Sequence, residues 1–584
     1  MGYDEIPPKI IKWAPNLFAP ILQVIFNKCI DMGYYPISMK VAKVAPVYKD
    51  GEKNNLNNYR PISVLTQFNQ LFELLLSKRF LNFFDKFNVI TKRQFGFLKK
   101  HCTEHAILDL KEYILECLDR KEVMAVLFLD LQKAFDTVSH DILLNKLYYY
   151  GIRGNAHRLL SSYLSGRKQF TKVGNFISGL VSILWGVPQG SVLGPLLFLI
   201  FINDLPNACS LFSWIFADDT ALALSSKNFA ELEIRFNSEI NKAQDWLLAN
   251  GLSVHYVDKT KYMLIKGPGL CTSKVGSETN FKLIMGGHEI ERTDNYKYLG
   301  IYFDNKLSWK FQIAKMCSKL SSVCGIISKV RHYLDRKCLM LIYHSLFESR
   351  IRYGILAWGT ASEHDLNRLR VLQNRVVRFI SFASYTARAA HVYDKLKILP
   401  LTNQHLLQCT IFMHSFHYGT LPHTLSSYCQ RPEHNQATRY NTNLNYCIPY
   451  ITTIRGQSSI KFVGPKAWKE VPKIIKDIAF RKPFSQKMKE HILSDQMEMN
   501  KNLPMNSFNL RDFYGNTEGD NYTDLWSIFN SDDENTEFHG FDVCNLDKIF
   551  EDTFDEDYDF LGFDVGSIEH LFTESENEDE FYGF

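Results

Sequence analysis

The sequence predicts an α+β fold, in which helices pack on one face of a β-sheet. The apolar run Val123–Leu129 has the length of a buried strand and ends at an acid, Asp130. Two more apolar runs flank the adjacent acids Asp218 and Asp219, which is typical of a hairpin with both acids at its tip. Helical patterns separate these segments, so the order is strand, helix, acidic hairpin, helix, strand.

Three segments show the apolar spacing of amphipathic helices. The first follows Asp136 and is expected to stop at Gly151. The second and clearest spans residues 229–247 and is expected to stop at Asn250–Gly251. The third spans residues 366–380, and the arginines outside its apolar stripe either contact phosphates or form an ordinary solvated face.

Charge is distributed unevenly along the 584 residues. The hydrophobic content of 46% is enough for two to four domains with real cores, and the formal net charge is +4. Residues 516–584 hold 22 of the 63 acidic residues but one of the 67 basic residues, so the rest of the chain is strongly basic. A basic body favours a polyanion as its partner.

The sequence carries no pattern typical of export or membrane insertion. The twelve cysteines are scattered and indicate neither a disulfide framework nor a zinc finger. His101 and His105 are spaced as on one helix, but nothing nearby completes a zinc site. The apolar stretch Val192–Ile202 is too short and too interrupted to span a membrane. We expect an intracellular protein of the nucleus or cytoplasm, neither secreted nor membrane-bound.

The three acids predict a site for a divalent cation. Adjacent carboxylates repel each other, so Asp218 and Asp219 favour a cation that neutralises them. With Asp130 they offer the hard oxygen ligands that suit Mg²⁺, and Mg²⁺ held in this way commonly serves phosphoryl chemistry. The alternative is that the three acids merely end strands.

Seven motifs follow one another in order along the chain. They are Asn58-Tyr-Arg-Pro-Ile-Ser63, Gln94-Phe-Gly-Phe97, Phe128-Leu-Asp-Leu-Gln-Lys-Ala-Phe-Asp136, Gly186-Val-Pro-Gln-Gly-Ser-Val-Leu-Gly-Pro195, Phe216-Ala-Asp-Asp219, Gly251-Leu-Ser-Val254 with Lys259-Thr260, and Tyr298-Leu-Gly-Ile301. This set resembles the reverse transcriptases of jockey-type non-LTR retrotransposons, over roughly residues 1 to 490. The resemblance implies a right-hand polymerase with fingers, a ferredoxin-like palm and a helical thumb.

The resemblance also implies catalytic roles. Asp130 and Asp218 would bridge two Mg²⁺ ions, or Mn²⁺ in their place, with Asp219 next to the primer end. Lys259 would protonate the departing pyrophosphate as general acid, with Lys261 as a rival and a plain surface lysine as the alternative.

Further residues are implied to bind the substrates. Arg60 and Lys49 are candidates for the dNTP triphosphate, although the nearby Lys43 competes with Lys49. Phe135 would crowd a ribose 2′-hydroxyl as a steric gate, or is an ordinary core residue. Gln189 and Gly190 would touch the template–primer near the incoming base, or belong only to a helix-initiating loop.

We expect five regions. They are the fingers with the pre-finger region (1–100), the catalytic palm (101–303), the helical thumb (304–430), a basic C-terminal region (431–500) and an acidic, largely disordered tail (501–584). The tail repeats a Gly-Phe-Asp-Val segment with a period of 22 residues. It is expected to dock on the basic body, to recruit an unknown protein partner, or to have no function.

The predicted activity is RNA-directed DNA polymerisation, with an RNA template, a DNA primer or target, and dNTPs. The alternative is a catalytically inactive nucleic-acid-binding protein derived from such an element. Elements of this kind usually carry an endonuclease upstream of the polymerase, and none precedes Gly2–Lys9. We therefore expect a truncated copy or one portion of a larger product.

Overall fold

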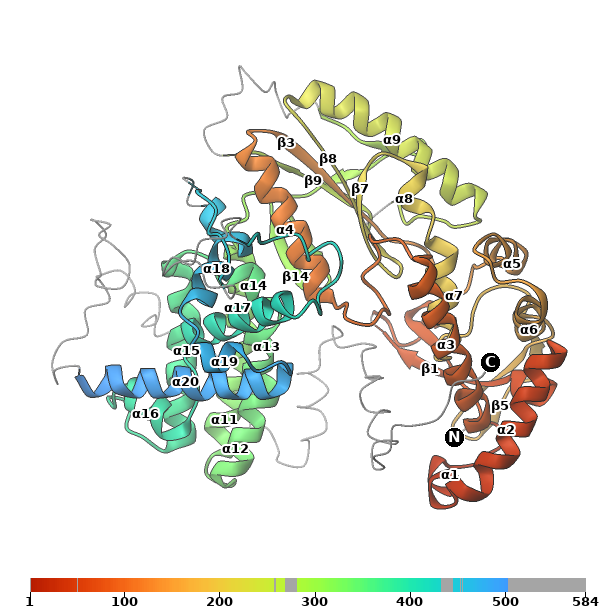
Figure 1. The fold of residues 1–584 in the computed structure, drawn as a ribbon, viewed down its shortest axis with the longest axis horizontal. Helices are drawn as coiled ribbons and strands as arrows, with labels where there is room; N and C mark the ends of the chain where they lie inside the picture. The colour runs from red at the N-terminus through yellow and green to blue at the C-terminus, as the bar shows by residue number, and fades with distance from the viewer. Residues whose placement is uncertain are drawn as a thin grey trace. The chain divides into compact units, whose positions relative to one another are not determined.

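The computed structural model describes residues 2–49, 51–256, 259–267, 281–431, 445–451, 453 and 455–502 (Figure 1). The chain divides into two units, Met1–Tyr48 with Tyr59–Glu498, and Lys49–Asn58 with Met499–Phe584. In the second unit, residues Leu56–Asn58 form a 3-10 turn, and Asn58 O accepts a hydrogen bond from Lys49 N (2.8 Å). All but the first two residues of the predicted tail, and its repeat, lie outside the described residues.

The described elements of the first unit are mixed α and β. The strands are β1 (Val41–Tyr48), β2 (Tyr59–Val64), β3 (Val123–Leu129), β4 (Lys168–Val173), β5 (Phe176–Ile177), β6 (Val181–Ser182), β7 (Phe212–Phe216), β8 (Asp219–Ser226), β9 (Lys261–Ile265), β10 (Ile284–Met285), β11 (His288–Glu289), β12 (Glu291–Arg292), β13 (Asn295–Tyr298) and β14 (Ile301–Asp304). The helices before residue 300 are α1 (Pro8–Trp13), α2 (Pro15–Met32), α3 (Gln67–Phe87), α4 (Thr103–Asp119), α5 (His140–Tyr149), α6 (Gly154–Leu164), α7 (Leu193–Ile202), α8 (Leu205–Ala208) and α9 (Phe229–Ala249). Those after it are α11 (Lys310–Val330), α12 (Arg336–Ile342), α13 (Ser349–Arg352), α14 (Ile355–Trp358), α15 (Glu363–Ser381), α16 (Ala389–Leu396), α17 (Leu401–His417), α18 (Ile460–Lys469), α19 (Lys473–Lys476) and α20 (Arg481–Asn502).

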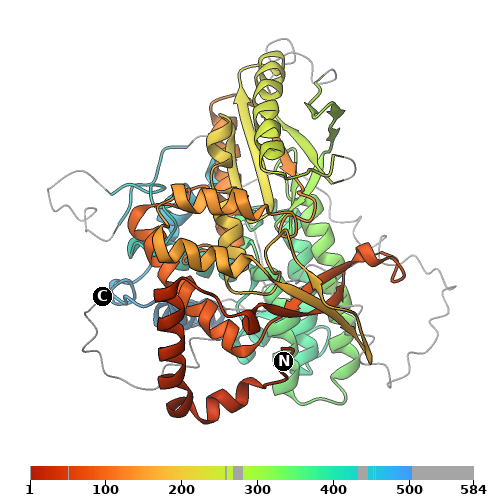
Figure 2. The same ribbon diagram turned by 90° about the vertical axis from the view of Figure 1, so that its right-hand side faces the viewer.

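The central sheet has the strand order β12-β9-β3-β8-β7 in the described part of the chain. Alternate side chains of β3 enter different cores. Leu127 packs in the first core, with α7 and α9, whereas Val126 and Phe128 pack in the second core, with α4 and α11. Helices therefore cover both faces of this sheet, with α9 on one side and α4 on the other (Figure 1, Figure 2). The expectation of helices on one face only was wrong, because the continuous apolar run of β3 is that of a strand buried on both faces.

A second sheet has the order β2-β1-β4-β5, with β6 also paired to β4. β1 is antiparallel to β2 and parallel to β4. Arg60 lies on β2 of this sheet, opposite Val47.

The strongest helical patterns fold as predicted. α9 buries the stripe that includes Phe236 and Ile240, and α5 buries Leu143 and Leu147. α15 covers the predicted segment 366–380. Each pattern supplies enough apolar area on one side to fix the helix against a core.

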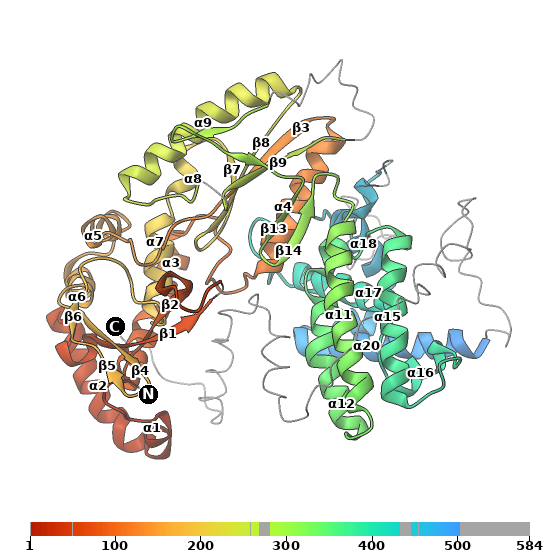
Figure 3. The same cartoon turned by 180° about the vertical axis from the view of Figure 1, so that it is seen from behind.

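The described residues after 304 are mainly helical, as expected up to residue 430. α11 and α15 pack in the second core, next to the β13–β14 hairpin (Figure 3). α17, α18 and α20 share a third core around Trp468. No helix in the described residues is both long and apolar enough to cross a membrane.

Candidate active site at the end of the central sheet

Asp130, Asp218 and Asp219 lie at the same end of the central sheet. β3 and β8 are antiparallel neighbours, and the last pair of their ladder joins Leu129 to Thr220. Asp130 therefore follows β3 at the level of Asp219, the first residue of β8. Asp218 stands in the turn between β7 and β8. The backbone thus brings the three predicted catalytic acids to the same end of the neighbouring strands.

The turn that carries Asp218 is strained and supported from outside. Ala217 and Asp218 form a two-residue turn, and Ala217 has a φ of 57°, in the left-handed region that disfavours a residue with a Cβ. Gln94 Oε1 accepts hydrogen bonds from Ala217 N (3.2 Å) and from Gly96 N (2.8 Å). The Gln-Phe-Gly-Phe motif therefore holds the hairpin tip in its conformation.

Asp130 is surrounded by groups that precede β9. Its carbonyl accepts a hydrogen bond from His255 N (2.9 Å), and His255 Nε2 lies 4.0 Å from Asp130 Oδ2. Lys259 Nζ lies 3.5 Å from the same oxygen. The rival Lys261 instead pairs with Glu291 (3.1 Å). Of the two lysines, it is Lys259 that the structure places beside Asp130.

Two tyrosines of β13 lie near the same acids. Tyr298 is buried in the second core, and Tyr296 stacks on Phe128 with ring centroids 4.1 Å apart and planes 8° apart. Burial, followed by the negative charges of Asp219 and Asp130, raises the pKa of Tyr296. The phenol therefore stays neutral next to the carboxylates.

The donor chemistry of the site suits a hard divalent cation. Three carboxylates at one strand edge are the oxygen ligands that Mg²⁺ prefers. Within the described residues, however, no three His, Cys, Asp or Glu side chains are gathered closely enough to hold an ion. One oxygen of Asp130 is directed at Lys259 instead. Asp130, Asp218 and Asp219 would be the residues to hold a divalent cation here.

The loop 186–190 is fixed to the turn that follows Asp130. Gly186 has a φ of 83° and donates its N–H to Val138 O (2.8 Å). A Cβ on Gly186 would lie 2.7 Å from Asp136 O, so a larger residue requires the backbone to move.

Gln189 and Gly190 connect this loop to β2. Gln189 Nε2 donates to Asp136 Oδ1 (3.3 Å), and Ser63 N donates to Gln189 O (2.7 Å). A Cβ on Gly190 would lie 2.8 Å from Ser63 O. Burial raises the pKa of Asp136, a cost that the Gln189 amide partly offsets. The loop is thus held between β2 and the segment that carries Asp130.

Arg60 shares a face of β2 with a residue that contacts this loop. Ile62 Cγ2 would lie 3.3 Å from a Cβ on Gly190. Residues two apart on a strand point to the same side, so Arg60 faces the side of Ile62. Lys49 belongs to the second unit, and its role as a triphosphate ligand stays a prediction.

Phe135 is half-buried on the turn after β3. Its ring stacks on Phe198 of α7, with centroids 4.6 Å apart and planes 25° apart. Its carbonyl accepts a hydrogen bond from Val187 N (2.8 Å). Partial exposure fits both interpretations of Phe135, the steric gate and the core residue.

Comparison with known proteins identifies the part of the chain that carries this site. Residues 49–303 match the family model described as reverse transcriptase (RNA-dependent DNA polymerase). Residues 49–303 are a reverse transcriptase domain. The RNA-directed DNA polymerase from the mobile element jockey of Drosophila melanogaster is 28% identical over 410 residues, 68% of this chain and 44% of that protein. The probable RNA-directed DNA polymerase from transposon BS of the same species is 28% identical over 72% of this chain and 46% of its own length.

The resemblance to jockey-type reverse transcriptases is thus confirmed, and the chain spans about half the length of these relatives. Among solved structures, telomerase from Candida albicans with a fragment of telomeric RNA matches at 11% identity and a TM-score of 0.33, over 63% of this chain and 64% of that one. Apo telomerase from Candida tropicalis matches at 11% identity and a TM-score of 0.36, over 66% and 67%. Likeness at this level carries no argument about function.

The reverse transcriptase domain also contains a buried acid that sequence reasoning missed. Glu73 of α3 accepts hydrogen bonds from Val192 N (2.6 Å) and Leu193 N (3.3 Å), at the start of α7. Asn69 and Tyr163 donate to its other oxygen. Burial raises the pKa of Glu73, and these donors oppose the rise. Glu73 thereby fixes the loop that ends in Gly190 to α3.

Two further residues near the acids were not singled out from the sequence. They are Tyr296 and Gln94, and the one sequence feature that points to them is that each lies in or beside a motif.

One expectation about a helix was wrong. His101 precedes α4, which begins at Thr103, so His101 and His105 do not share one helix as expected.

Proposed function

We propose that this chain is an RNA-directed DNA polymerase that extends a primer 3′-hydroxyl with dNTPs on an RNA template. The observation that carries the proposal is the placement of Asp130, Asp218 and Asp219 at one sheet edge inside a reverse transcriptase domain. In the same proposal, residues 1–100 are the fingers, 101–303 the palm and 304–430 the helical thumb.

The three acids are the proposed ligands of two Mg²⁺ ions, which would activate the 3′-hydroxyl and stabilise the leaving pyrophosphate. Lys259 neutralises Asp130 in the present conformation, at 3.5 Å. The ammonium of Lys259 is the proposed donor of a proton to the departing pyrophosphate oxygen.

The substrate contacts follow from the surrounding loops. Arg60 and Lys49 are the proposed ligands of the triphosphate, since guanidinium and ammonium groups bind phosphate oxygens. The ring of Phe135 would crowd a ribose 2′-hydroxyl. Gln189 and Gly190 would support the template–primer near the incoming base, because their loop is fixed both to β2 and to the Asp130 turn.

The proposed partners are an RNA template and a DNA primer or target. The basic body supports this choice, because phosphate neutralisation by Lys and Arg supplies most non-specific affinity. We further propose action in the nucleus or cytoplasm. An unidentified protein partner is proposed for the acidic tail, which apart from its first two residues lies outside the described residues.

Primer extension on an RNA template with Mg²⁺ and dNTPs tests the activity. We expect synthesis by the wild type and none by Asp218→Ala. The matched control is Asp245→Ala, which removes an exposed carboxylate of α9 in the same domain and should leave the rate unchanged. Salt-sensitive RNA binding without synthesis, indifferent to Mg²⁺, would instead establish an inactive nucleic-acid-binding protein. Full synthesis by Asp218→Ala would refute the assigned site.

A further inference from the structure

Helix α4 is packed on two faces. One face is apolar and lies in the second core, with Leu110 and Ile114 against the central sheet. The other face carries Asp109, Glu112 and Glu116, at steps of three and four residues. Asp109 and Glu112 are 6% and 1% exposed. Buried carboxylates are costly unless hydrogen-bonding partners satisfy them.

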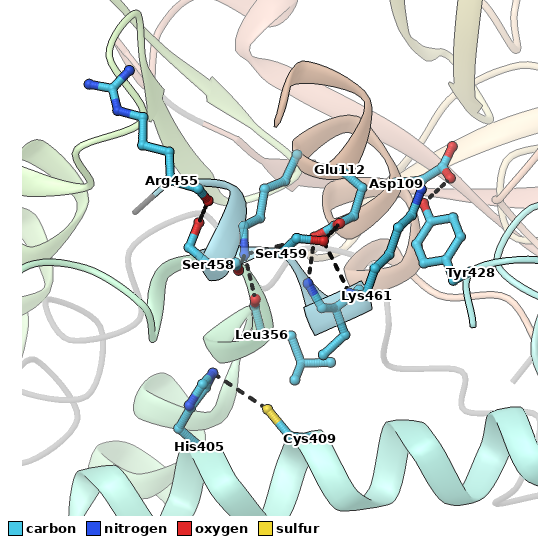
Figure 4. Close-up of polar contacts among 12 residues, drawn as sticks. Asp109, Glu112, Leu356, His405, Cys409, Tyr428, Arg455, Ser458, Ser459 and Lys461 are labelled. Atoms are coloured by element: carbon cyan, nitrogen blue, oxygen red, sulfur yellow. Dashed lines mark hydrogen bonds and ion pairs between the residues drawn. The ribbon is translucent and has the colours of Figure 1, made fainter. Parts of the chain in front are cut away.

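The partners of this face come from far along the chain, in what we call the docked segment, the described residues of 428–461. Glu112 accepts hydrogen bonds from Ile460 N (2.9 Å) and from Ser459 Oγ (Figure 4). Ser459 is the N-cap of α18, where a carboxylate is favoured by the free N–H groups and by the helix dipole. The docked segment therefore binds α4 through specific polar contacts as well as through the third core.

Asp109 makes a different connection. Its Oδ1 accepts a hydrogen bond from the Tyr428 hydroxyl (Figure 4), and its Oδ2 accepts one from Trp214 Nε1 at 2.7 Å. Trp214 is fully buried on β7, where it pairs with Ala221 of β8. One carboxylate thus joins the docked segment to the hairpin that carries Asp218.

We propose that Asp109 is a positioning residue for the hairpin 212–226, and that the docked segment is its anchor. Trp214 precedes Asp218 by four residues, and paired strands move as a unit. A shift of the indole is therefore passed to the turn. The inference rests on the proposed function, in which Asp218 and Asp219 must be held level with Asp130 at the end of the sheet.

The test compares three variants in primer extension, with kcat, KM for dNTP and template–primer affinity measured separately. Asp109→Leu removes both acceptors and should lower kcat by about tenfold or more, since sub-ångström to 1 Å misplacement of catalytic groups costs up to about a hundredfold. Tyr428→Phe removes only the hydrogen bond from the docked segment to Asp109 and should lower kcat by a smaller factor. Asp109→Asn should restore most of the rate, because its amide can accept from Trp214 and donate to Tyr428.

The matched control is Tyr418→Phe. It removes a hydroxyl that donates to Lys476 O (2.9 Å), away from α4, and should leave kcat unchanged. A merely structural role for Asp109 would lower the fraction of folded protein and leave kcat per folded molecule unchanged. Equal kcat in the wild type and folded Asp109→Leu would overturn the proposal.

Hydrogen–deuterium exchange separates this inference from the proposed function. Amides of residues 212–226 should exchange faster in Asp109→Leu and in Tyr428→Phe than in the wild type, whether or not the wild type synthesises DNA. Faster exchange with an inactive wild type would keep the coupling and reject the polymerase. Unchanged exchange of the hairpin in both variants would reject the coupling itself.

Discussion

Gly96→Ala adds one methyl group against the turn that carries Asp218. A Cβ at Gly96 would lie 2.7 Å from Ala217 N and 3.2 Å from Phe216 C, whereas ordinary contact begins near 3.4 Å. The closest of the atoms in the way, Ala217 N, belongs to the backbone, so relief requires the hairpin tip and the Gln94–Gly96 segment to separate by roughly 0.7 Å. Gln94 Oε1, which accepts from both sides, opposes this separation.

A displacement of this size acts on catalysis more than on folding. We expect a loss of stability of about 1–3 kcal/mol, as for other overpacked sites. The expected loss in kcat is about tenfold to a hundredfold, because the acids at the tip move relative to Asp130. Template–primer affinity should hardly change, since no basic group is removed. Steady-state primer extension with a urea melt of each protein measures the three quantities.

Gly325→Ala is the matched control for the added methyl group. Gly325 lies inside α11 with nothing within 4 Å of a Cβ, so this variant should gain about 1 kcal/mol of helix stability and keep its kcat. A folded Gly96→Ala enzyme with a kcat within about threefold of the wild type would refute the reasoning, because the turn would then tolerate a shift that the chemistry should feel.

Three further predictions concern single side chains. Phe135→Val should raise the ratio of rNTP to dNTP incorporation by about tenfold or more in competition assays, and an unchanged ratio would leave Phe135 as a core residue. Lys259→Gln should lower kcat by about tenfold to a hundredfold, whereas Lys261→Gln, which loses only its pair with Glu291, should leave kcat unchanged. Burial lowers the pKa of His405 to about 4, so the unfolded chain takes up a proton at a higher pH than the folded protein, and the free energy of unfolding should fall by about 3 kcal/mol as the pH falls from about 6.5 to 4. Urea melts across that range should show a weaker pH dependence in His405→Gln, and an identical slope would contradict the assignment.

The parts of the fold that could be predicted are those with strong local patterns. The run Val123–Leu129, the acidic hairpin and the helix 229–247 each contain their own periodicity and end signals, and each is present in the structure. Because a hairpin fixes its own register, the position of Asp218 at its tip also followed from sequence. The level of Asp130 relative to Asp219 needed the β3–β8 pairing, which a single sequence does not encode locally.

The parts that could not be predicted depend on distant partners. Asp109 and Glu112 have the spacing of an ordinary solvated helix face, yet their partners lie 319 and 348 residues away along the chain. Glu73 gave no signal either, since its partners include Tyr163 and backbone N–H groups at the start of α7, all of them far away along the chain. Lys259 and Lys261 are equivalent by composition, and only the fold sets one of them beside Asp130.

The long separation between α4 and the docked segment has a consequence for biosynthesis. At about 5–20 residues per second, a ribosome needs on the order of 15 seconds to a minute to travel from Asp109 to Tyr428. Once residue 303 has been made, the nascent chain contains the whole matched domain, but Tyr428, the hydrogen-bond partner of Asp109, is still to be added. Under the proposed coupling, the hairpin 212–226 therefore gains its anchor only after translation has passed residue 461.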